Sequence, residues 1–506
     1  MIKDDVSVIV PTLKELKANF LTKKSRPITF RLQQLHNLLN GLKELRNEFY
    51  EAFKKDLGYQ DQFFCELVQY QAVLTHIESD INNIYKYTAK RSISTSIMAA
   101  PGTSYLIPEP YGVVLVIGAW NYPIFTCIPQ VAQAIGAGNA VVLKPSEMVP
   151  HLSNVLAKLI TNYLDQSLYR VIEGGVNVAI NITKQPFDLI IFTGGTEKGK
   201  LVAKAAAENL VPCILELGGK GPCIIDSSSD LALAGRRVIS TKLYNCGQTC
   251  VAPDYLLVEE SILDNVVNIF KQQIKDFYGP ETKKSECLNR IVNEFHTNRI
   301  VEYLNNHGGK IVHGGQYDLK EKWIEPTFII NPNPNSELMK NEIFGPILPI
   351  ITYKKIEEAI NFINSRPKPL ALYYFGTNKV HKNAILESTS SGGVCINDCI
   401  FHLINHELPF GGVGDSGYGV CGSKFGFDQC QHLKPVLEKS IIDPSARYPP
   451  YTNSKKNQMA FLTSLGIYSQ QEILNKLLLF LFILCAFIYV TCCCGGCSKN
   501  QLQNDL

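Results

Sequence analysis

The feature that most constrains the fold is a repeated alternation of short apolar runs with helical stretches, which begins at Gly112. The runs read GVVLVIGAW, AVVLKPS, YRVIEGG and FDLIIFTGG, and helical patterns separate them. Continuous β-branched runs between helices are typical of parallel strands that are covered on both faces. The alternation therefore predicts an open α/β sheet of the nucleotide-binding type, followed from about Glu216 by a second α/β unit.

The segments on either side of this alternation have different patterns. Residues 13–90 show helical spacing, and Gly58 is expected to end a long helix. Residues 91–111 are poor in charge and rich in Ser, Pro and Gly, which favours an arm over a core element. Residues 443–470 are polar with several prolines, and we interpret them as a linker. A chain of 506 residues is long enough for two or three folded units.

The C-terminus carries a long apolar segment. Residues 473–494 read ILNKLLLFLFILCAFIYVTCCC, and a helix of this length just crosses the hydrocarbon core of a bilayer. A buried core helix is the alternative, but such a helix usually has a polar stripe, which Leu477–Val490 lacks. The N-terminus shows no sustained apolar stretch of the kind that a secretory signal peptide has. The sequence therefore predicts a single-pass tail anchor with the bulk of the chain in the cytosol.

Charge and cysteine content weigh against several other classes of protein. Lysine and arginine (49) against aspartate and glutamate (46) give a formal net charge of +3, too small to bind nucleic acid through bulk charge. The 16 cysteines have no regular disulfide spacing and no paired zinc-ligand motifs, so we expect reduced thiols and no metal site. Lipidation of the cysteines in or beside the anchor stays a secondary possibility.

A glycine-rich turn is the first candidate for ligand binding. The stretch FTGGTEKGK, residues 192–200, follows one predicted strand and precedes a helix. Gly194, Gly195 and Gly199 would allow the backbone and a helix N-terminus to approach a pyrophosphate. Thr196 interrupts the usual G-x-G-x-x-G spacing, so this turn alone is weak evidence for a nucleotide.

Polar residues at the ends of neighbouring strands form the second candidate group. Lys144 and Glu147 follow the run AVVL and are suited to ribose hydroxyls, although an ordinary exposed turn explains them as well. Glu216 ends an apolar run beside two glycines, where burial would raise the pKa of its carboxyl and let it activate water. A salt-bridged structural role for Glu216 is the alternative.

The stretch YNCGQTC, residues 244–250, holds two candidate nucleophiles. A cysteine in a glycine-containing loop is a nucleophile when nearby donors stabilise its thiolate. Cys246 and Cys250 are equal candidates on this ground, and most cysteines are buried and inert. In GAWNYP, the Asn121 amide could donate to a developing oxyanion, or it could simply cap a loop.

Seven motifs in a fixed order resemble those of a known family. They are WNYP, KPSE, FTGGTEKG, LELGGKGPC, GQTCVAPDY, EIFGPILPI and LPFGGVGDSG. With them the chain is similar to the aldehyde dehydrogenase superfamily over about residues 10–440, and most similar to the class 3 branch. That branch includes fatty aldehyde dehydrogenases, some of which also end in an apolar tail.

The resemblance implies a role for each matching residue. Cys250 takes the place of the nucleophile, so that Cys246 becomes a non-catalytic neighbour whose thiol could form a disulfide with Cys250 under oxidation. Asn121, with the backbone N–H of Cys250, resembles the oxyanion hole, and Glu216 resembles the general base. The residues that resemble cofactor contacts are Lys144 and Glu147 at the adenosine ribose, Gly194, Gly195, Thr196 and Gly199 under the phosphates, Glu342 at the nicotinamide ribose and Phe344 beside it.

These roles imply NAD(P)-dependent oxidation of an aldehyde to a carboxylic acid through a covalent thiohemiacetal and thioester on Cys250. NAD is the expected cofactor, with NADP also acceptable. The anchor favours medium- to long-chain aliphatic (fatty) aldehydes from lipid metabolism and the membrane of the endoplasmic reticulum. Two alternatives stay open, namely an enzyme that passes the acyl group to coenzyme A and a non-catalytic membrane scaffold.

The resemblance also implies a homodimer and a division into domains. The expected fold is a Rossmann-like nucleotide-binding domain, an α/β catalytic domain, a small bridging arm and a C-terminal transmembrane helix. The expected boundaries are 1–90 and 108–215 for the NAD(P)-binding domain, 216–420 for the catalytic domain, 91–107 and 421–442 for the bridging or oligomerisation arm, 443–472 for the linker and 473–494 for the anchor.

Overall fold

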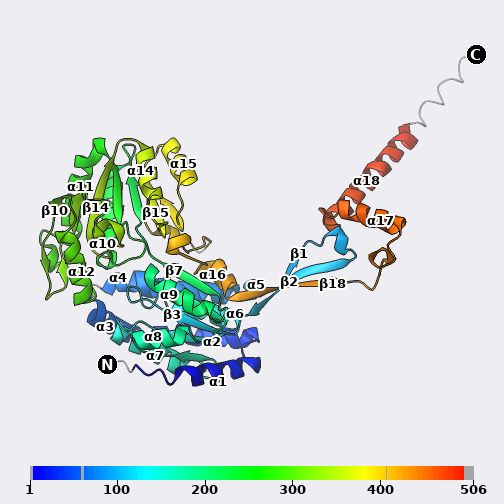
Figure 1. Cartoon of the computed structure of the whole chain (residues 1–506), viewed down its shortest axis with the longest axis horizontal. Helices are drawn as coiled ribbons and strands as arrows, with labels where there is room; N and C mark the ends of the chain where they lie inside the picture. The colour runs from blue at the N-terminus through cyan, green and yellow to red at the C-terminus, as the bar shows by residue number, and fades with distance from the viewer. Residues whose placement is uncertain (1–3, 59–61, 406, 495–506) are drawn as a thin grey trace, which may run out of the picture. The chain divides into compact units, whose positions relative to one another are not determined.

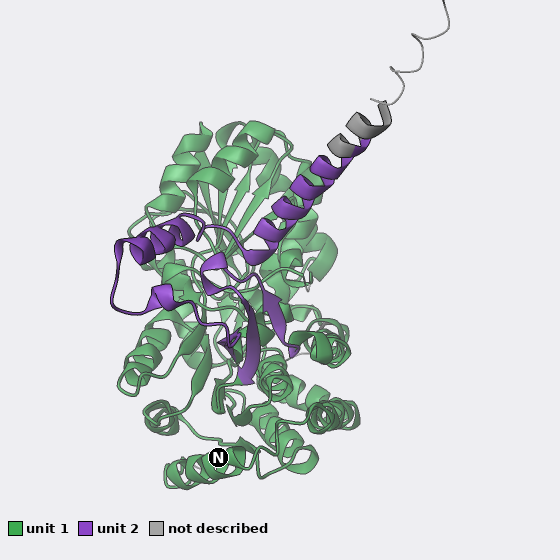
Figure 2. Ribbon diagram, turned by 90° about the vertical axis from the view of Figure 1, so that its right-hand side faces the viewer, with its two compact units in different colours: residues 1–87, 110–431 green, residues 88–109, 432–506 purple. Residues whose placement is uncertain are grey.

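The computed structural model describes residues 4–58, 62–405 and 407–494, and Figure 1 shows its elements. The chain divides into two compact units, one of residues 1–87 and 110–431 and the other of residues 88–109 and 432–506 (Figure 2). The first unit contains both large sheets and all the predicted site residues. The second contains a small sheet and the C-terminal helices.

A six-stranded sheet forms one core of the first unit. Its strand order is β17, β7, β6, β3, β4, β5, and all neighbouring pairs except β17 with β7 run parallel. The strands are β3 (Val113–Ile117), β4 (Ala140–Lys144), β5 (Tyr169–Val171), β6 (Leu189–Gly194), β7 (Cys213–Leu217) and β17 (Gly417–Tyr418). Every residue of β3 and β4 is buried, so both faces of the sheet are covered. The predicted parallel sheet is confirmed.

Helices pack around this sheet, as the helical spacing predicts. They are α1 (Ile9–Leu21), α2 (Ile28–Glu44), α3 (Arg46–Leu57), α5 (Ala72–Tyr87), α6 (Ile128–Ala137), α7 (Pro150–Tyr163), α8 (Val176–Thr183) and α9 (Thr196–Ala207). The long helix expected before Gly58 is in fact two, because Leu45 leaves the helical conformation between α2 and α3. Gly58 does end α3, in the left-handed conformation (φ 67°) that glycine adopts at low cost.

A seven-stranded sheet forms the second core of the first unit. Its order is β10, β13, β14, β9, β8, β15, β16, and only β10 is antiparallel to its neighbour. The strands are β8 (Pro222–Ile225), β9 (Tyr255–Glu259), β10 (Lys310–His313), β13 (Thr327–Ile330), β14 (Ile347–Tyr353), β15 (Ala371–Phe375) and β16 (Gly393–Ile396). Its helices are α10 (Leu231–Leu243), α11 (Leu263–Tyr278), α12 (Glu294–Asn305), α13 (Glu337–Lys340), α14 (Ile356–Asn364) and α15 (Lys379–Ser388). A short helix, α16 (Ser423–Gln429), ends this part of the chain.

The second unit is built on a three-stranded sheet in the order β1, β2, β18. The strands are β1 (Arg91–Ile93), β2 (Gly102–Pro110) and β18 (Gln431–Lys439), so residues far apart in sequence are paired. The segment expected to be a linker, 443–472, contains the helix α17 (Asn453–Ser464).

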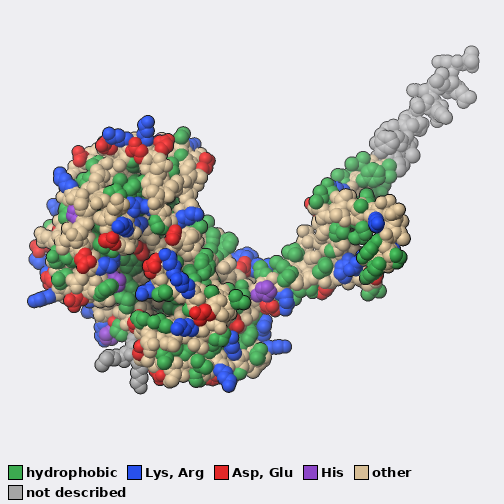
Figure 3. Space-filling model, in the orientation of Figure 1, with side chains coloured by type: hydrophobic (Ala, Val, Ile, Leu, Met, Phe, Trp, Pro, Cys, Tyr) green, Lys and Arg blue, Asp and Glu red, His purple; other side chains and the backbone are tan. Residues whose placement is uncertain are grey.

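The last helix, α18 (Gln470–Cys494), covers the segment predicted as a membrane anchor. Its side chains Leu477 to Leu484 are between 41% and 71% exposed, and Figure 3 shows them as an apolar surface. The side chains of residues 487, 488 and 490–494, which belong to the predicted anchor, lie outside the described residues. Over the described part of the chain, no helix has both the length and the apolarity needed to cross a membrane.

Candidate active site

The parallel strands bring the first predicted residues to one edge of the six-stranded sheet. Lys144 ends β4 and lies opposite Ile117 of β3, which lies opposite Phe192 of β6. Thr193 of β6 lies opposite Glu216 of β7. Lys144, Glu216 and the glycine turn after β6 therefore share the carboxyl edge of the sheet, where open α/β sheets bind their ligands.

A tight loop connects α10 to Cys250. Asn245, Cys246 and Gly247 all have positive φ, at 48°, 56° and 77°. This conformation is costly for residues with a Cβ, and a Cβ at Gly247 would lie 2.3 Å from the carbonyl oxygen of Gly345. The two candidate nucleophiles, one in this strained turn and one after it, differ in exposure. Cys246 is fully buried, and Cys250 is half-buried.

Side-chain amides hold this loop against Asn121. Asn245 Nδ2 donates to the Asn121 carbonyl oxygen at 2.9 Å, and Asn121 Nδ2 donates to the Gln248 carbonyl oxygen at 3.1 Å. Gln248 Nε2 donates to the Asn245 carbonyl oxygen at 2.9 Å, and Gln248 Oε1 accepts from the Val292 N–H at 2.9 Å. Asn121 is thus fixed beside the Cys250 loop, and its amide has a second hydrogen that can point to a ligand.

Some surroundings of the Cys250 thiol raise its pKa and others lower it. Burial raises this pKa well above its ordinary value, and the carboxyl groups of Glu216 and Glu342 raise it further. The backbone N–H groups of Cys250 and Val251 donate toward the sulfur and lower the pKa. The thiol is therefore neutral until a base takes its proton, and the N–H groups lie where negative charge would develop.

Glu216 has the properties of such a base. Its side chain is buried, and Thr193 Oγ1 donates to its Oε2 at 3.2 Å. Burial raises the pKa of the Glu216 carboxyl to about 7, against the lowering effect of the Thr193 hydrogen bond. A carboxyl group with this pKa can both accept and return a proton near neutral pH.

Glu342 carries a buried oxygen that fits a ligand hydroxyl. The backbone N–H of Gly219 donates to its carboxylate, and burial raises its pKa to about 8. Among the described residues, Oε1 of Glu342 has no hydrogen-bond partner. A buried acceptor in this state fits a donor such as the predicted ribose hydroxyl. Nearby, the ring of Phe344 lies edge-on to Trp120, with 5.3 Å between the ring centroids.

The glycine-rich turn has room for the phosphates of a dinucleotide at Gly195, whereas Gly199, also predicted there, packs against the protein. Helix α9 begins at Thr196 after Gly195, and no described side chain caps its N-terminus. A Cβ at Gly195 would meet no described atom within 4 Å, so the position is open to a ligand. A Cβ at Gly199 would lie 2.5 Å from the Leu217 side chain, so Gly199 serves the packing of α9 on β7. Gly194 is the last residue of β6.

The predicted adenosine-ribose contacts are paired with each other. Lys144 Nζ is buried and donates to the Glu147 carboxylate at 3.0 Å and to the Pro145 carbonyl oxygen at 3.1 Å. The Glu147 side chain is 36% exposed. The pair therefore leaves part of the Glu147 carboxylate accessible to a ligand at the sheet edge.

A narrow cavity of about 20 Å³, enough for about one water molecule, opens beside Glu216. Its apolar lining residues are Phe125, Pro129, Leu403, Leu408 and Phe410. The remaining lining residues are His76, Gln130, Glu216, Asn405, Cys421 and Gly422. The lining residues Asn405, Leu408 and Phe410 of this cavity lie outside the described helices and strands.

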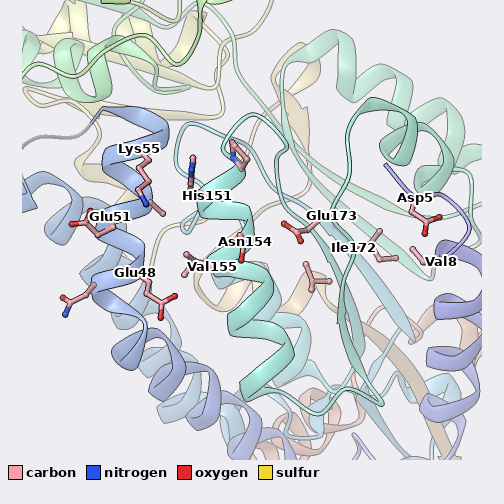
Figure 4. A pocket seen from close by; sticks show the side chains of 14 residues that line it. Asp5, Val8, Glu48, Glu51, Lys55, His151, Asn154, Val155, Ile172 and Glu173 are labelled. Atoms are coloured by element: carbon pink, nitrogen blue, oxygen red, sulfur yellow. The ribbon is translucent and has the colours of Figure 1, made fainter. Parts of the chain in front are cut away.

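A larger hollow of about 910 Å³ lies between α3 and α7 (Figure 4). Acidic and basic side chains line it together, among them Glu51, Lys55, His151 and Glu173. None of the predicted site residues lines this hollow. Size alone therefore does not identify the active site.

Sequence reasoning missed two groups of residues. Asn245 and Gln248 hold the nucleophile loop, and their amides beside a cysteine in YNCGQTC were an available signal. The cavity residues come from α5, α6 and two distant loops, and no sequence pattern joins them. Lys242 was also missed; it is fully buried, and among the described residues its Nζ has no hydrogen-bond partner.

Comparisons with known proteins agree with this geometry. A model of the aldehyde dehydrogenase family matches residues 9–436. The chain is similar to aldehyde dehydrogenase family 3 member A2 of Rattus norvegicus, with 43% identity over 454 residues that cover 89% of this chain and 93% of the relative. It is also similar to the dimeric NADP-preferring aldehyde dehydrogenase of the same organism, with 42% identity over 449 residues, 88% of this chain and 98% of the relative.

A solved structure gives the same result. The substrate-bound AldH of Staphylococcus aureus superposes with a TM-score of 0.87 and 38% sequence identity. The match covers 90% of this chain and 99% of that one.

Proposed function

The chain belongs to the aldehyde dehydrogenase family, and from this premise we propose how its residues oxidise an aldehyde to a carboxylic acid with NAD(P). One observation carries the proposal. The half-buried Cys250 thiol lies in a loop that is hydrogen-bonded to Asn121, and the buried carboxyl groups of Glu216 and Glu342 act on its pKa. We assign Cys250 as the nucleophile and Glu216 as the base.

In the first step Cys250 adds to the aldehyde carbonyl. Because the thiol is neutral, its proton passes to Glu216, whose pKa of about 7 allows it to accept. The Asn121 amide and the backbone N–H of Cys250 stabilise the oxyanion of the resulting thiohemiacetal. A bound nicotinamide would supply the acceptor for the hydride that the substrate carbon loses. The product on Cys250 is then a thioester.

In the second step water hydrolyses the thioester. Glu216 first releases the proton from Cys250 to solvent and then removes a proton from this water. As the tetrahedral intermediate collapses, the acid leaves and the Cys250 thiolate takes up a proton. Glu342, through its buried Oε1, would hold a nicotinamide-ribose hydroxyl, and the open turn at Gly195 would receive the phosphates. Transfer to coenzyme A is the alternative fate of the thioester, and a base next to the cysteine favours hydrolysis. The released product, free acid or acyl-CoA, separates the two.

The preferred substrates are medium- to long-chain aliphatic aldehydes. Five of the residues that line the cavity beside Glu216 are apolar, which suits an alkyl chain and gives a polar aldehyde no binding energy. NAD is preferred over NADP, because the Glu147 carboxylate repels a 2′-phosphate.

We also propose that the enzyme is a homodimer attached through residues 473–494 to the membrane of the endoplasmic reticulum. The exposed apolar side chains of α18 support attachment, since contact with water is unfavourable for them. The name of the dimeric relative supports the oligomeric state. Flotation with liposomes tests the attachment: the full chain should float, and a chain shortened after Gln470 should sediment.

The function is tested by following nicotinamide reduction with the full chain in detergent, over aldehydes from propanal to hexadecanal. We expect kcat/KM to increase with chain length, and Cys250→Ser to abolish the reaction. Cys246→Ala is the matched control and should keep it. If no aldehyde of any length is oxidised, the proposal is wrong, and a non-catalytic membrane scaffold becomes the function to test.

A further inference from the structure

The cavity beside Glu216 contains a second thiol that the proposed reaction does not use. Cys421 lines this cavity together with Gln130 and Glu216. Its thiol hydrogen-bonds to the Gln130 side chain and lies within electrostatic range of the Glu216 carboxyl. Cys421 is the only one of the described cysteines that lines the cavity. The cavity thus joins a nucleophilic atom, a base and apolar walls.

The backbone fixes this thiol opposite the apolar loop. The Cys421 N–H donates to the Phe410 carbonyl oxygen at 2.7 Å, which forms an isolated bridge between the two residues. Next to the thiol, Gly422 leaves space, since a Cβ there would meet only the His76 side chain, at 3.7 Å. A guest that enters along the apolar wall therefore passes Cys421 beside Glu216.

The thiol needs a base in order to react. Burial raises the pKa of Cys421 well above its ordinary value, the Glu216 charge raises it further, and the Gln130 hydrogen bond lowers it. The neutral thiol is a poor nucleophile alone. Glu216, with a pKa of about 7, is positioned in the same cavity to take the proton as sulfur attacks.

We propose that Cys421 is a covalent modification site for α,β-unsaturated aldehydes. The Cys421 sulfur forms a bond to the β-carbon of the enal while its proton passes to Glu216. The carbon–carbon double bond becomes a single bond, and a proton from Glu216 or water is delivered to the α-carbon. Nothing is oxidised or reduced and no group leaves.

The adduct keeps its aldehyde group. Its alkyl chain is longer than the cavity, which holds about one water molecule, and extends from it past the apolar residues Leu408 and Phe410. An enal would therefore be both a substrate at Cys250 and a slow inactivator at Cys421, whereas a saturated aldehyde of equal length would be a substrate only. This inference rests on the proposed function, because it identifies the cavity as the path of the aldehyde.

The test uses the full chain with Cys250→Ser, so that the enal is neither oxidised nor trapped by the nucleophile. The protein is incubated with trans-2-octenal, treated with borohydride to fix the adduct, digested and mapped by mass spectrometry. We expect one octenal equivalent on the Cys421 peptide, and its loss when Cys421→Ser or Cys421→Ala is added. Octanal should leave no adduct on the Cys421 peptide, because a thiohemiacetal reverses on denaturation, and any lysine adducts that borohydride fixes should be the same with both aldehydes. Labelling of the exposed Cys287 alone, or unchanged labelling without Cys421, would overturn the proposal.

A second measurement tests whether Glu216 is the base that takes the Cys421 proton. In the Cys250→Ser background, Glu216→Gln should slow labelling of Cys421 at least about 100-fold at pH 8. It should also remove the increase in labelling rate as pH rises through 7. An equal rate in Glu216→Gln would refute the base role. Circular dichroism of every variant verifies that a loss of labelling is not a loss of folding.

The labelling does not depend on turnover, so the two proposals fail separately. If the intact enzyme does not reduce nicotinamide with octanal, the proposed function fails. If it does, but Cys421 in the Cys250→Ser protein acquires no octenal, the modification site fails. With Cys250 intact, exposure to octenal should inactivate the enzyme over time, and the Cys421→Ser enzyme should lose its starting rate more slowly.

Discussion

Two buried charged regions of the first unit differ in how completely their polar atoms are satisfied. In the Lys220 cluster, which consists of Lys220, Asp254 and residues 338–343 at the end of α13 and after it, each charge has several partners. Lys220 Nζ pairs with the Asp254 carboxylate and donates to the carbonyl oxygens of Leu338 and Asn341, both at 2.9 Å. Asp254 Oδ1 accepts from the Ile343 N–H at 3.0 Å.

The polar atoms of the Cys250 site, formed by Cys250, Asn121, Glu216 and Glu342, are less completely satisfied. The Glu342 Oε1 has none among the described residues, and Glu216 accepts a hydrogen bond from the Thr193 hydroxyl. Burying a polar atom without a partner destabilises a fold, so it persists where a ligand completes it. The comparison shows that the Lys220 cluster holds the loop that carries Glu342, whereas the Cys250 site keeps a buried oxygen of Glu342 available to a ligand.

The largest effect should follow from removal of the nucleophile. Cys250→Ala should reduce kcat by at least about 10⁴-fold, because no other group can form the thioester. Its urea unfolding free energy should stay within about 1 kcal/mol of the wild type, since the half-buried thiol contributes little packing. A large loss of stability would show that the Cys250 site also supports the fold and would break the comparison.

The opposite pattern is expected in the Lys220 cluster. Lys220→Met should lower the free energy of unfolding by about 3–5 kcal/mol, because it leaves the Asp254 charge buried and unpaired. Adding Asp254→Asn should recover most of this loss, since the neutral amide still accepts the Ile343 N–H. Urea unfolding of both variants measures this. If Lys220→Met unfolds like the wild type, the cluster has no structural role.

Glu216→Gln should slow both the addition of Cys250 to the aldehyde and the deacylation by about 100- to 1000-fold, because Glu216 is the proposed base in both steps. In the wild type, kcat should rise as Glu216 loses its proton near pH 7, and this limb should be absent in the variant. In the variant, rapid mixing should show that nicotinamide reduction is slow from the first turnover, without a burst. A variant that turns over at the wild-type rate would assign the base elsewhere.

The same carboxyl should make stability fall as pH rises. Burial raises the pKa of Glu216 from 4.5 to about 7, so the folded protein binds a proton that the unfolded chain releases between these values. Its contribution is therefore fully present below pH 4.5 and lost as pH rises to about 7. Glu216→Gln should remove this dependence and be more stable than the wild type by roughly 3 kcal/mol at pH 8. Thermal or urea unfolding from pH 4 to 8 measures the difference, and equal slopes for the two proteins would contradict it.

The contrast between the two regions also explains what the sequence could predict. Local apolar runs in the sequence predict the parallel strands. The ends of these strands then place Lys144 and Glu216 at one edge of the six-stranded sheet. The break at Leu45 was missed, because the apolar spacing continues across it. The satisfied cluster and the cavity have no local sequence signal, since Lys220 pairs with Asp254, 34 residues away, and Cys421 shares its cavity with Gln130 and Glu216, which lie far earlier in the sequence. Such contacts depend on how loops cross, which no local pattern encodes.

The smallest effect should come from Glu147, whose pairing with Lys144 lies between the two extremes. Glu147→Gln should raise the ratio of kcat/KM for NADP to that for NAD about fivefold, because one partly exposed charge is worth about 1 kcal/mol. Steady-state kinetics with both cofactors at low ionic strength measures the ratio, and added salt should reduce the difference.

The exposed Glu51, which lines the hollow of Figure 4, offers a control of equal charge change, and Glu51→Gln should leave the ratio unchanged. An unchanged ratio in Glu147→Gln would mean that its carboxylate does not face the cofactor, and Lys144 and Glu147 would then belong with the satisfied pairs that serve only the fold.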